Sequence, residues 1–142
     1  MVTISPYLNF PGNTEEAFDF YKSVFGGEFS AIQRFKDTPE GDKTHKDEQD
    51  KLMHIALPIG HGVVLMGTDA LASHGFKLTQ GNHINLSINT ESEAEAEKIF
   101  NGLSAGGRVT MPLAKTFWGA YFGMLFDQYG IQWMVNYDYP RV

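Results

Sequence analysis

The sequence comprises 142 residues (15.9 kDa), of which 42% are hydrophobic and 13% aromatic, enough for one compact domain with a core of its own. Its 11 Lys and Arg residues are outnumbered by 17 Asp and Glu residues, which gives a formal charge of −6 and argues against nucleic acid or an anionic membrane as a partner. The chain has no cysteine, which excludes disulfides, a thiol nucleophile and thiolate metal ligands.

The sequence carries no signal for a membrane span or for export. No apolar run approaches the roughly 18 residues that a membrane-spanning helix needs. Residues 1–6 lack the basic-then-apolar pattern of a secretory signal. We take the cytoplasm as the default location.

The chain opens with the pattern of a half-buried strand. Ile4, Leu8 and Phe10 share one apolar face, whereas Tyr7 and Asn9 point to the opposite side. We expect this polar side to face a ligand rather than the core.

A helix is predicted next, with Asn13 as its N-cap, Glu16 in the reciprocal capping position and Gly26-Gly27 at its end. Three strands follow, and the last two form a hairpin; we expect them at residues 29–35, 52–57 and 63–67. The mostly charged segment 36–51 between the first two predicts a solvated, mobile excursion, with a lid as the alternative.

The second half repeats this plan. Ile84, Leu86 and Ile88 form the apolar side of a strand, and His83 and Asn85 lie on the other side. A capping box at residues 90–93 begins a second helix, which ends at Gly106-Gly107. Three strands follow, with a tight turn at residues 127–130 between the last two; we expect them at residues 108–111, 121–127 and 131–137.

The repeat predicts the fold class. Two βαβββ modules, at about residues 1–75 and 82–142, form a single α+β domain. Each sheet buries one face against its own helix, so we expect the two curved mixed sheets to enclose a shared cavity with their other faces.

The sequence also resembles a known family over its whole length. The motifs that carry the resemblance are Ile4-Ser5-Pro6-Tyr7-Leu8-Asn9-Phe10, Gly12-Asn13, Phe117-Trp118, the Asp127-x-x-Gly130 turn, and Ile131-Gln132-Trp133-Met134-Val135-Asn136. They are similar to those of the PhnB-like branch of the vicinal oxygen chelate superfamily, which includes glyoxalase I, bleomycin-resistance proteins, fosfomycin-resistance enzymes and extradiol dioxygenases. The resemblance implies paired βαβββ modules and a homodimer.

The resemblance also raises the question of a divalent metal site. The superfamily's metal enzymes take one ligand from the first strand and one from the last strand of each module. The corresponding positions here offer Ser5, His83, residues 63–66 and residues 132–134, of which only His83 is a good ligand. We therefore expect no resident metal or other cofactor. A weakly held ion on His54 and His83, with Asp69, is the alternative.

The candidate site residues follow from the polar strand faces and the aromatic C-terminal third. We expect a small organic ligand to contact residues that line an apolar-aromatic cavity: Tyr7, Asn9, His54, His83, Asn85, Trp118 and Trp133. For Trp133, packing in the core is the equal alternative. His45, His61 and His74 are expected in exposed loops.

Two functions remain open. The first is binding of the ligand without chemistry. The second is an enzyme on a small organic substrate, with His83 or His54 as the acid-base group. A Rossmann-type methyltransferase, the activity attached to some members of this branch, is excluded because the only close-set Gly-x-Gly, Gly60-His61-Gly62, lies inside a predicted hairpin.

Overall fold

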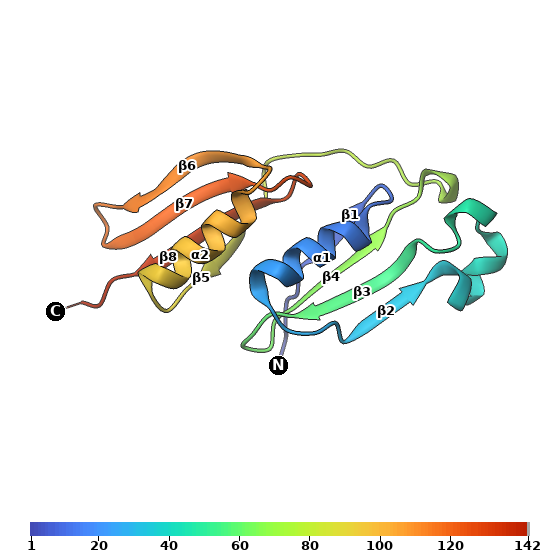
Figure 1. The fold of residues 1–142 in the computed structure, drawn as a ribbon, viewed down its shortest axis with the longest axis horizontal. Coiled ribbons are helices and arrows are strands. Elements are labelled where there is room, and N and C mark those ends of the chain that lie inside the picture. Colours follow the sequence, from blue (N-terminus) through green and yellow to red (C-terminus); the bar gives the residue numbers. More distant parts are fainter. Residues whose placement is uncertain (142) are drawn as a thin grey trace. The chain divides into compact units, whose positions relative to one another are not determined.

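The computed structural model describes residues 1–141 and divides the chain into two compact units, Met1–Thr79 and Gln80–Val142, here called module 1 and module 2 (Figure 1). Each module is a four-stranded mixed sheet with one α-helix, which confirms the predicted α+β class and the two βαβββ units. None of the helices in residues 1–141 is long and apolar enough to cross a membrane.

Module 1 contains five regular elements in the predicted order. They are β1 (Tyr7–Phe10), α1 (Thr14–Phe25), β2 (Ala31–Arg34), β3 (Leu52–Pro58) and β4 (Val64–Asp69). The strand order in its sheet is β1-β4-β3-β2, with β1 parallel to β4 and the other neighbours antiparallel. The sheet is open, because β1 and β2 end it without pairing with each other.

Module 2 has the same plan. Its elements are β5 (Leu86–Asn89), α2 (Glu93–Ser104), β6 (Arg108–Lys115), β7 (Ala120–Phe126) and β8 (Gln132–Asp138). The strand order is β5-β8-β7-β6, with β5 parallel to β8. The turn between β7 and β8 has Gly130 at φ 90°, which glycine adopts without the steric cost of a side chain.

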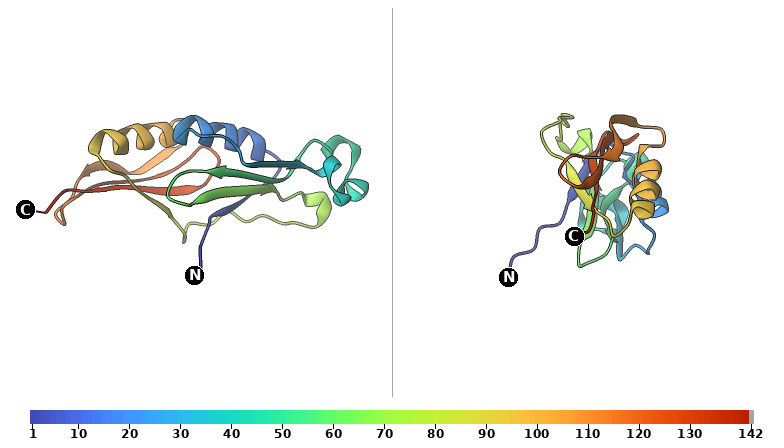
Figure 2. Two further views of the ribbon diagram at one scale, coloured as in Figure 1. Left: turned by 90° about the horizontal axis from the view of Figure 1, so that it is seen from below. Right: turned by 90° about the vertical axis from the view of Figure 1, so that its left-hand side faces the viewer.

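One helical phenylalanine packs against a glycine of the sheet in each module, so that each helix covers one face of its own sheet (Figure 2). A Cβ atom on Gly67 in β4 would lie 2.6 Å from the Phe18 ring of α1. A Cβ atom on Gly123 in β7 would lie 2.6 Å from the Phe100 ring of α2. These two glycines therefore permit the close approach of helix and sheet.

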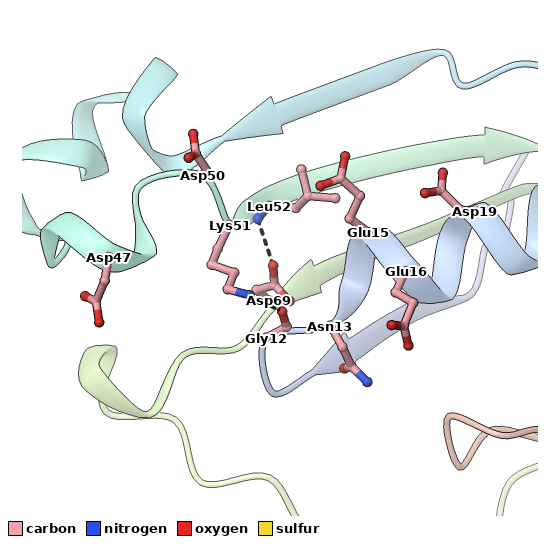
Figure 3. Close-up of a pocket in the computed structure, with 10 residues that line it drawn as sticks. All are labelled: Gly12, Asn13, Glu15, Glu16, Asp19, Asp47, Asp50, Lys51, Leu52 and Asp69. Atoms are coloured by element: carbon pink, nitrogen blue, oxygen red, sulfur yellow. Dashed lines mark hydrogen bonds between the residues drawn. The ribbon is translucent and has the colours of Figure 1, made fainter.

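The first helix has Asn13 at its N-cap position, as predicted, but a different residue supplies the capping side chain. Asn13 makes no side-chain capping bond. The buried carboxylate of Asp69, at the end of β4, instead accepts from the backbone N–H and the hydroxyl of Thr14 (3.0 and 2.7 Å) and from the Leu52 N–H (2.8 Å, Figure 3). A carboxylate is well placed at a helix N-terminus, where the backbone N–H groups lack partners. The cap comes from a residue distant in sequence, so local spacing does not identify it.

The second helix uses a capping box shifted by two residues from the predicted one. Ser92, not Thr90, is the N-cap, and its hydroxyl accepts from the Glu95 N–H (3.1 Å). The Glu95 carboxylate in turn accepts a hydrogen bond from the Glu91 N–H (3.1 Å). Thr90 is buried and bonds through its hydroxyl to the carbonyls of Ser92 and Asn136.

The first strand of each module is shorter than predicted at its start. Ile4 and Ile84 are exposed and lie before β1 and β5. Extension of the parallel registers Tyr7–Met66 and Leu86–Trp133 would pair Ile4 with residue 63 and Ile84 with residue 131. Residues 63 and 131 lie in the turns β3–β4 and β7–β8. Because those residues are committed to turns, the ladders cannot extend that far.

The charged segment 36–51 is a folded excursion. It contains the 3₁₀ helices η1 (Phe35–Asp37), η2 (Pro39–Lys43) and η3 (Lys46–Glu48). The Gln49 amide donates to the carbonyls of Gly41 and Thr44 (2.8 and 2.7 Å). His74, in η4 (Ala72–His74), was expected in an exposed loop but is half-buried: its ring packs edge-on against Phe35 and bonds the Thr44 hydroxyl (3.2 Å).

The two helix caps give different expectations for stability. Asp69→Ala should lower the free energy of unfolding by about 3 kcal/mol, because it leaves two buried N–H groups and a hydroxyl without an acceptor. Ser92→Ala removes one exposed capping bond and should cost about 1 kcal/mol. Urea unfolding followed by circular dichroism measures both, and equal losses would contradict the wider role of Asp69.

Candidate functional site

The face of the module 1 sheet opposite α1, here called open face 1, carries two rows of side chains. The strand registers give the rows as Tyr7, Met66, Ala56 and Ala31, and Asn9, Thr68, His54 and Gln33. The alternate residues Leu8, Ile55 and Leu65 are buried beneath the helix. The predicted residues Tyr7, Asn9 and His54 therefore share one face, and an apolar row with a thioether lies beside a polar one.

Tyr7 and His54 form the most specific contact on open face 1. The phenol oxygen of Tyr7 lies 3.0 Å from Nδ1 of His54, with the ring centroids 5.7 Å apart. Tyr7 is 46% exposed, and its partial burial raises the pKa of the phenol above its ordinary value. The phenol is therefore protonated at neutral pH and can donate to Nδ1. In the tautomer that accepts this bond, the imidazole carries its N–H at Nε2.

The corresponding face of module 2, here called open face 2, carries a row of methionines. The register aligns Met111, Met124 and Met134 with Ser87 of β5. A second row contains Asn89 and Asn136, and the Asn136 amide donates to the Asn89 side-chain oxygen (3.2 Å). Thioether side chains are flexible and polarisable, so this row forms an adaptable apolar surface.

Asn85 and Gln132 stand out on open face 2, because their side-chain oxygens are buried and no donor in residues 1–141 reaches them. Gln132 begins β8, and Asn85 directly precedes β5. Asn85 is one of the predicted ligand contacts. From its sequence position, Gln132 was expected only as a possible metal ligand. The alternation of residues 131–137 already places its side chain on the other face of the strand from the buried Trp133.

The two tryptophans have different environments. Trp118 is 55% exposed in the turn between β6 and β7, where its ring packs edge-on against the exposed ring of Phe117 (4.9 Å) and also against Phe122 (6.0 Å). Trp133 is 1% exposed and donates its indole N–H to the Asp127 carboxylate (2.8 Å). We therefore correct the prediction for Trp133: its ring belongs to the core of module 2, and its polar group is already used.

His83 does not lie on a strand. It is exposed in a bend before β5, because its register partner would be Gly130 of the β7–β8 turn. The strand alternation that aimed His83 at a ligand therefore does not apply to it.

The donors on the strands that carry metal in the superfamily do not fit a divalent ion. Among the candidate positions 63–66 and 132–134, those on the open faces of β4 and β8 hold Val64, Met66, Gln132 and Met134, which are poor ligands for Zn, Mn or Fe in this arrangement. Asp69, the third donor of the alternative site, uses its carboxylate to cap α1. Within residues 1–141, no three His, Cys, Asp or Glu side chains come close enough together to hold a metal ion.

A hollow of about 590 Å³ lies at the N-terminal end of α1, and none of the predicted ligand-contact residues lines it (Figure 3). Its charged groups largely bond to other protein groups. Lys51 donates to the Gly12 carbonyl (2.7 Å). The Arg34 guanidinium donates two hydrogen bonds to Glu15 (3.0 and 2.7 Å) and thereby holds the pKa of that carboxyl below its ordinary value. The hollow therefore offers a solvated acidic surface rather than a second candidate site.

Comparison with known proteins identifies the family. A family model described as 3-demethylubiquinone-9 3-methyltransferase matches residues 2–136. The chain belongs to this family. Its sheets have one parallel strand pair each, unlike the doubly wound sheet of a Rossmann-type methyltransferase, so the activity in the family's description is not carried over to this PhnB-like chain.

Solved structures agree with this membership. Protein PA1353 from Pseudomonas aeruginosa is 40% identical, with a TM-score of 0.85 over 97% of this chain and 98% of that one. A Bacillus cereus protein described as a putative 3-demethylubiquinone-9 3-methyltransferase, PhnB protein, is 28% identical, with a TM-score of 0.74 over 96% and 99%. A glyoxalase/bleomycin resistance protein/dioxygenase family enzyme from Burkholderia phytofirmans is 15% identical, with a TM-score of 0.60 over 94% and 97%, and shares the fold. The PhnB-like chain thus has the fold of a glyoxalase/bleomycin resistance/dioxygenase family enzyme, in agreement with the fold that its motifs predict.

The two tryptophans should respond differently to substitution. Trp133→Phe removes the buried donor to Asp127 and part of the core ring, so we expect the free energy of unfolding to fall by about 2 kcal/mol. Trp118→Ala should change it by about 0.5 kcal/mol or less, because the ring is half exposed. Urea unfolding of the two variants tests this, and a large loss for Trp118→Ala would assign that ring to packing.

Proposed function

We propose that this PhnB-like protein binds a small organic ligand on the open faces of its sheets and holds no resident metal. The observation that carries the proposal is the hydrogen-bonded pair of Tyr7 and His54, which stands on a partly exposed face beside the thioether of Met66. Few precisely placed polar groups on an otherwise apolar surface are typical of small-molecule sites.

The pair suits an aromatic ligand that carries a hydroxyl or carbonyl oxygen. With Nδ1 of His54 bonded to Tyr7, the Nε2–H group can donate to such an oxygen. Met66 and Ala56 occupy the neighbouring row and supply apolar contact. Asn9 is proposed as a further contact on open face 1. His83, Asn85 and Trp118 are proposed as ligand contacts of module 2, with Trp118 supported by its half-exposed ring.

A second candidate function is acid-base catalysis by His54, which the bond from Tyr7 favours because it fixes the imidazole orientation. Within residues 1–141, no hydrogen bond fixes the orientation of the His83 imidazole in this way. If His54 acts in this way, His54→Gln should abolish conversion of a bound substrate while binding survives. Depletion of a metabolite from a small-molecule extract, followed by mass spectrometry, separates catalysis from binding alone.

We further propose that the protein works in the cytoplasm as a homodimer. The resemblance to the superfamily and exposed apolar residues such as Ile84 and Phe117 support self-association.

Titration with 2-naphthol tests the binding proposal. We expect saturable shifts of backbone amide NMR signals around Tyr7, His54 and Met66. Tyr7→Phe removes the bond that fixes His54 and should weaken binding about tenfold.

Tyr121→Phe is the matched control for this titration. It also removes one phenol hydroxyl, but that hydroxyl bonds Glu97 of α2 (2.8 Å) and lies on the helix side of the other module. Its affinity for 2-naphthol should equal that of the wild type. Shifts that do not saturate, or equal weakening in both variants, would refute binding at the Tyr7–His54 pair.

A further inference from the structure

The strongest unexplained feature of the molecule is the pair of buried oxygens on open face 2. Oδ1 of Asn85 and Oε1 of Gln132 are shielded from solvent, and neither accepts a hydrogen bond from residues 1–141. Buried polar atoms in folded proteins nearly always have partners. A carbonyl oxygen left without one costs free energy, since it has lost its hydrogen bonds to water.

The two oxygens belong to neighbouring positions. The parallel register pairs Leu86 with Trp133, and one step back along both strands places Asn85 beside Gln132. Trp133 is buried in the core of module 2, so Gln132, the preceding residue of β8, lies on the opposite side, open face 2. Gln132 thus lies on the face that the helix does not cover, and the register places Asn85, which directly precedes β5, next to it along the sheet.

The surroundings fit an organic ligand rather than an ion. The next row of the face consists of Met134, Met124 and Met111, whose thioethers offer an adaptable apolar surface. The two amide oxygens carry no net charge. The nearest charged group along their own row is Arg108, whose guanidinium lies over the Phe126 ring at 4.8 Å.

We infer that Asn85 and Gln132 form an acceptor site for a ligand head group with N–H donors, an amine or a primary amide, whose apolar body lies on the methionine row. Two carbonyl oxygens accept from the two or more hydrogens that such a nitrogen carries. The inference rests on the proposed ligand-binding function and specifies the chemistry of a ligand on open face 2. The protein keeps two polar groups that weaken the free fold and become satisfied when the ligand binds.

Matched probes test the chemistry of the head group. 2-Naphthylmethylammonium and 2-naphthamide share an apolar body and carry N–H donors, with and without charge. Their N-methylated counterparts, the trimethylammonium and the N,N-dimethylamide, carry none. We expect both donors to bind the full-length protein at least about tenfold more tightly than their methylated partners, as measured by amide NMR shifts around residues 85, 132 and 134.

Isosteric variants test the two residues. Asn85→Leu and Gln132→Met keep the side-chain volume and remove the oxygen. Because no hydrogen bond is lost, each should raise the melting temperature by about 2–4 °C and weaken binding of 2-naphthylmethylammonium or 2-naphthamide about tenfold or more.

Asn89→Leu is the control, because Asn89 lies on the same strand and its oxygen already accepts from Asn136 (3.2 Å). It should lower the melting temperature and leave the affinity for the naphthyl probes unchanged. The contrast between Asn85 and Asn89 separates a free acceptor from a satisfied one.

Three outcomes would overturn the inference. A lower melting temperature in both Asn85→Leu and Gln132→Met would mean that the oxygens have partners in solution. Equal affinity for the donor probes and their methylated partners would mean that N–H groups are not recognised. Unchanged affinity of the two variants for the donor probes would lead to the same conclusion. If 2-naphthol still binds at Tyr7 and His54 in these cases, the head-group assignment fails and the proposed function stands; if no naphthyl probe binds, the proposed function fails as well.

Discussion

Each module depends on one buried carboxylate that accepts three hydrogen bonds. Asp69 joins the start of α1 to β3 and β4 through Thr14 and Leu52. Asp127 closes the β7–β8 turn by accepting from the backbone N–H groups of Tyr129 and Ile131 (2.8 and 3.1 Å), and it fixes the indole of Trp133. Buried donors need partners, and a carboxylate satisfies several from one position. These hydrogen bonds occupy the carboxylates of both aspartates, so neither carboxylate is available to a ligand or a metal ion.

Helix packing then decides which face of each sheet is left for function. Phe18 and Phe100 pack on Gly67 and Gly123, where no side chain separates helix from sheet. The alternation of a strand sends every second residue to the other side. The same register that buries Leu65 and Trp133 therefore presents Met66 and Gln132 on the open faces.

The fold that this chain shares with a glyoxalase/bleomycin resistance/dioxygenase family enzyme does not by itself fix the chemistry, which depends on the side chains on these faces. The strand positions associated with a divalent ion carry thioether and amide groups in this chain. The polar groups instead form a phenol–imidazole pair on one module and an amide pair on the other. Such groups orient an organic molecule by hydrogen bonds and leave its apolar part to the methionines.

The sequence by itself determined the repeated βαβββ plan, because periodicity, glycine pairs and turn residues act locally and recur in both halves. It also placed Tyr7 and Asn9 on one face, since alternation within a strand needs no tertiary information. That His54 shares this face depends on the register between distant strands. Only the tertiary structure decided that Asp69 rather than Asn13 caps α1, that His83 lies beyond its strand, and that Trp133 is held in the core by Asp127. These outcomes depend on contacts between distant segments: a carboxylate from β4, a ladder that ends where its partner turns, and a buried donor that needs an acceptor.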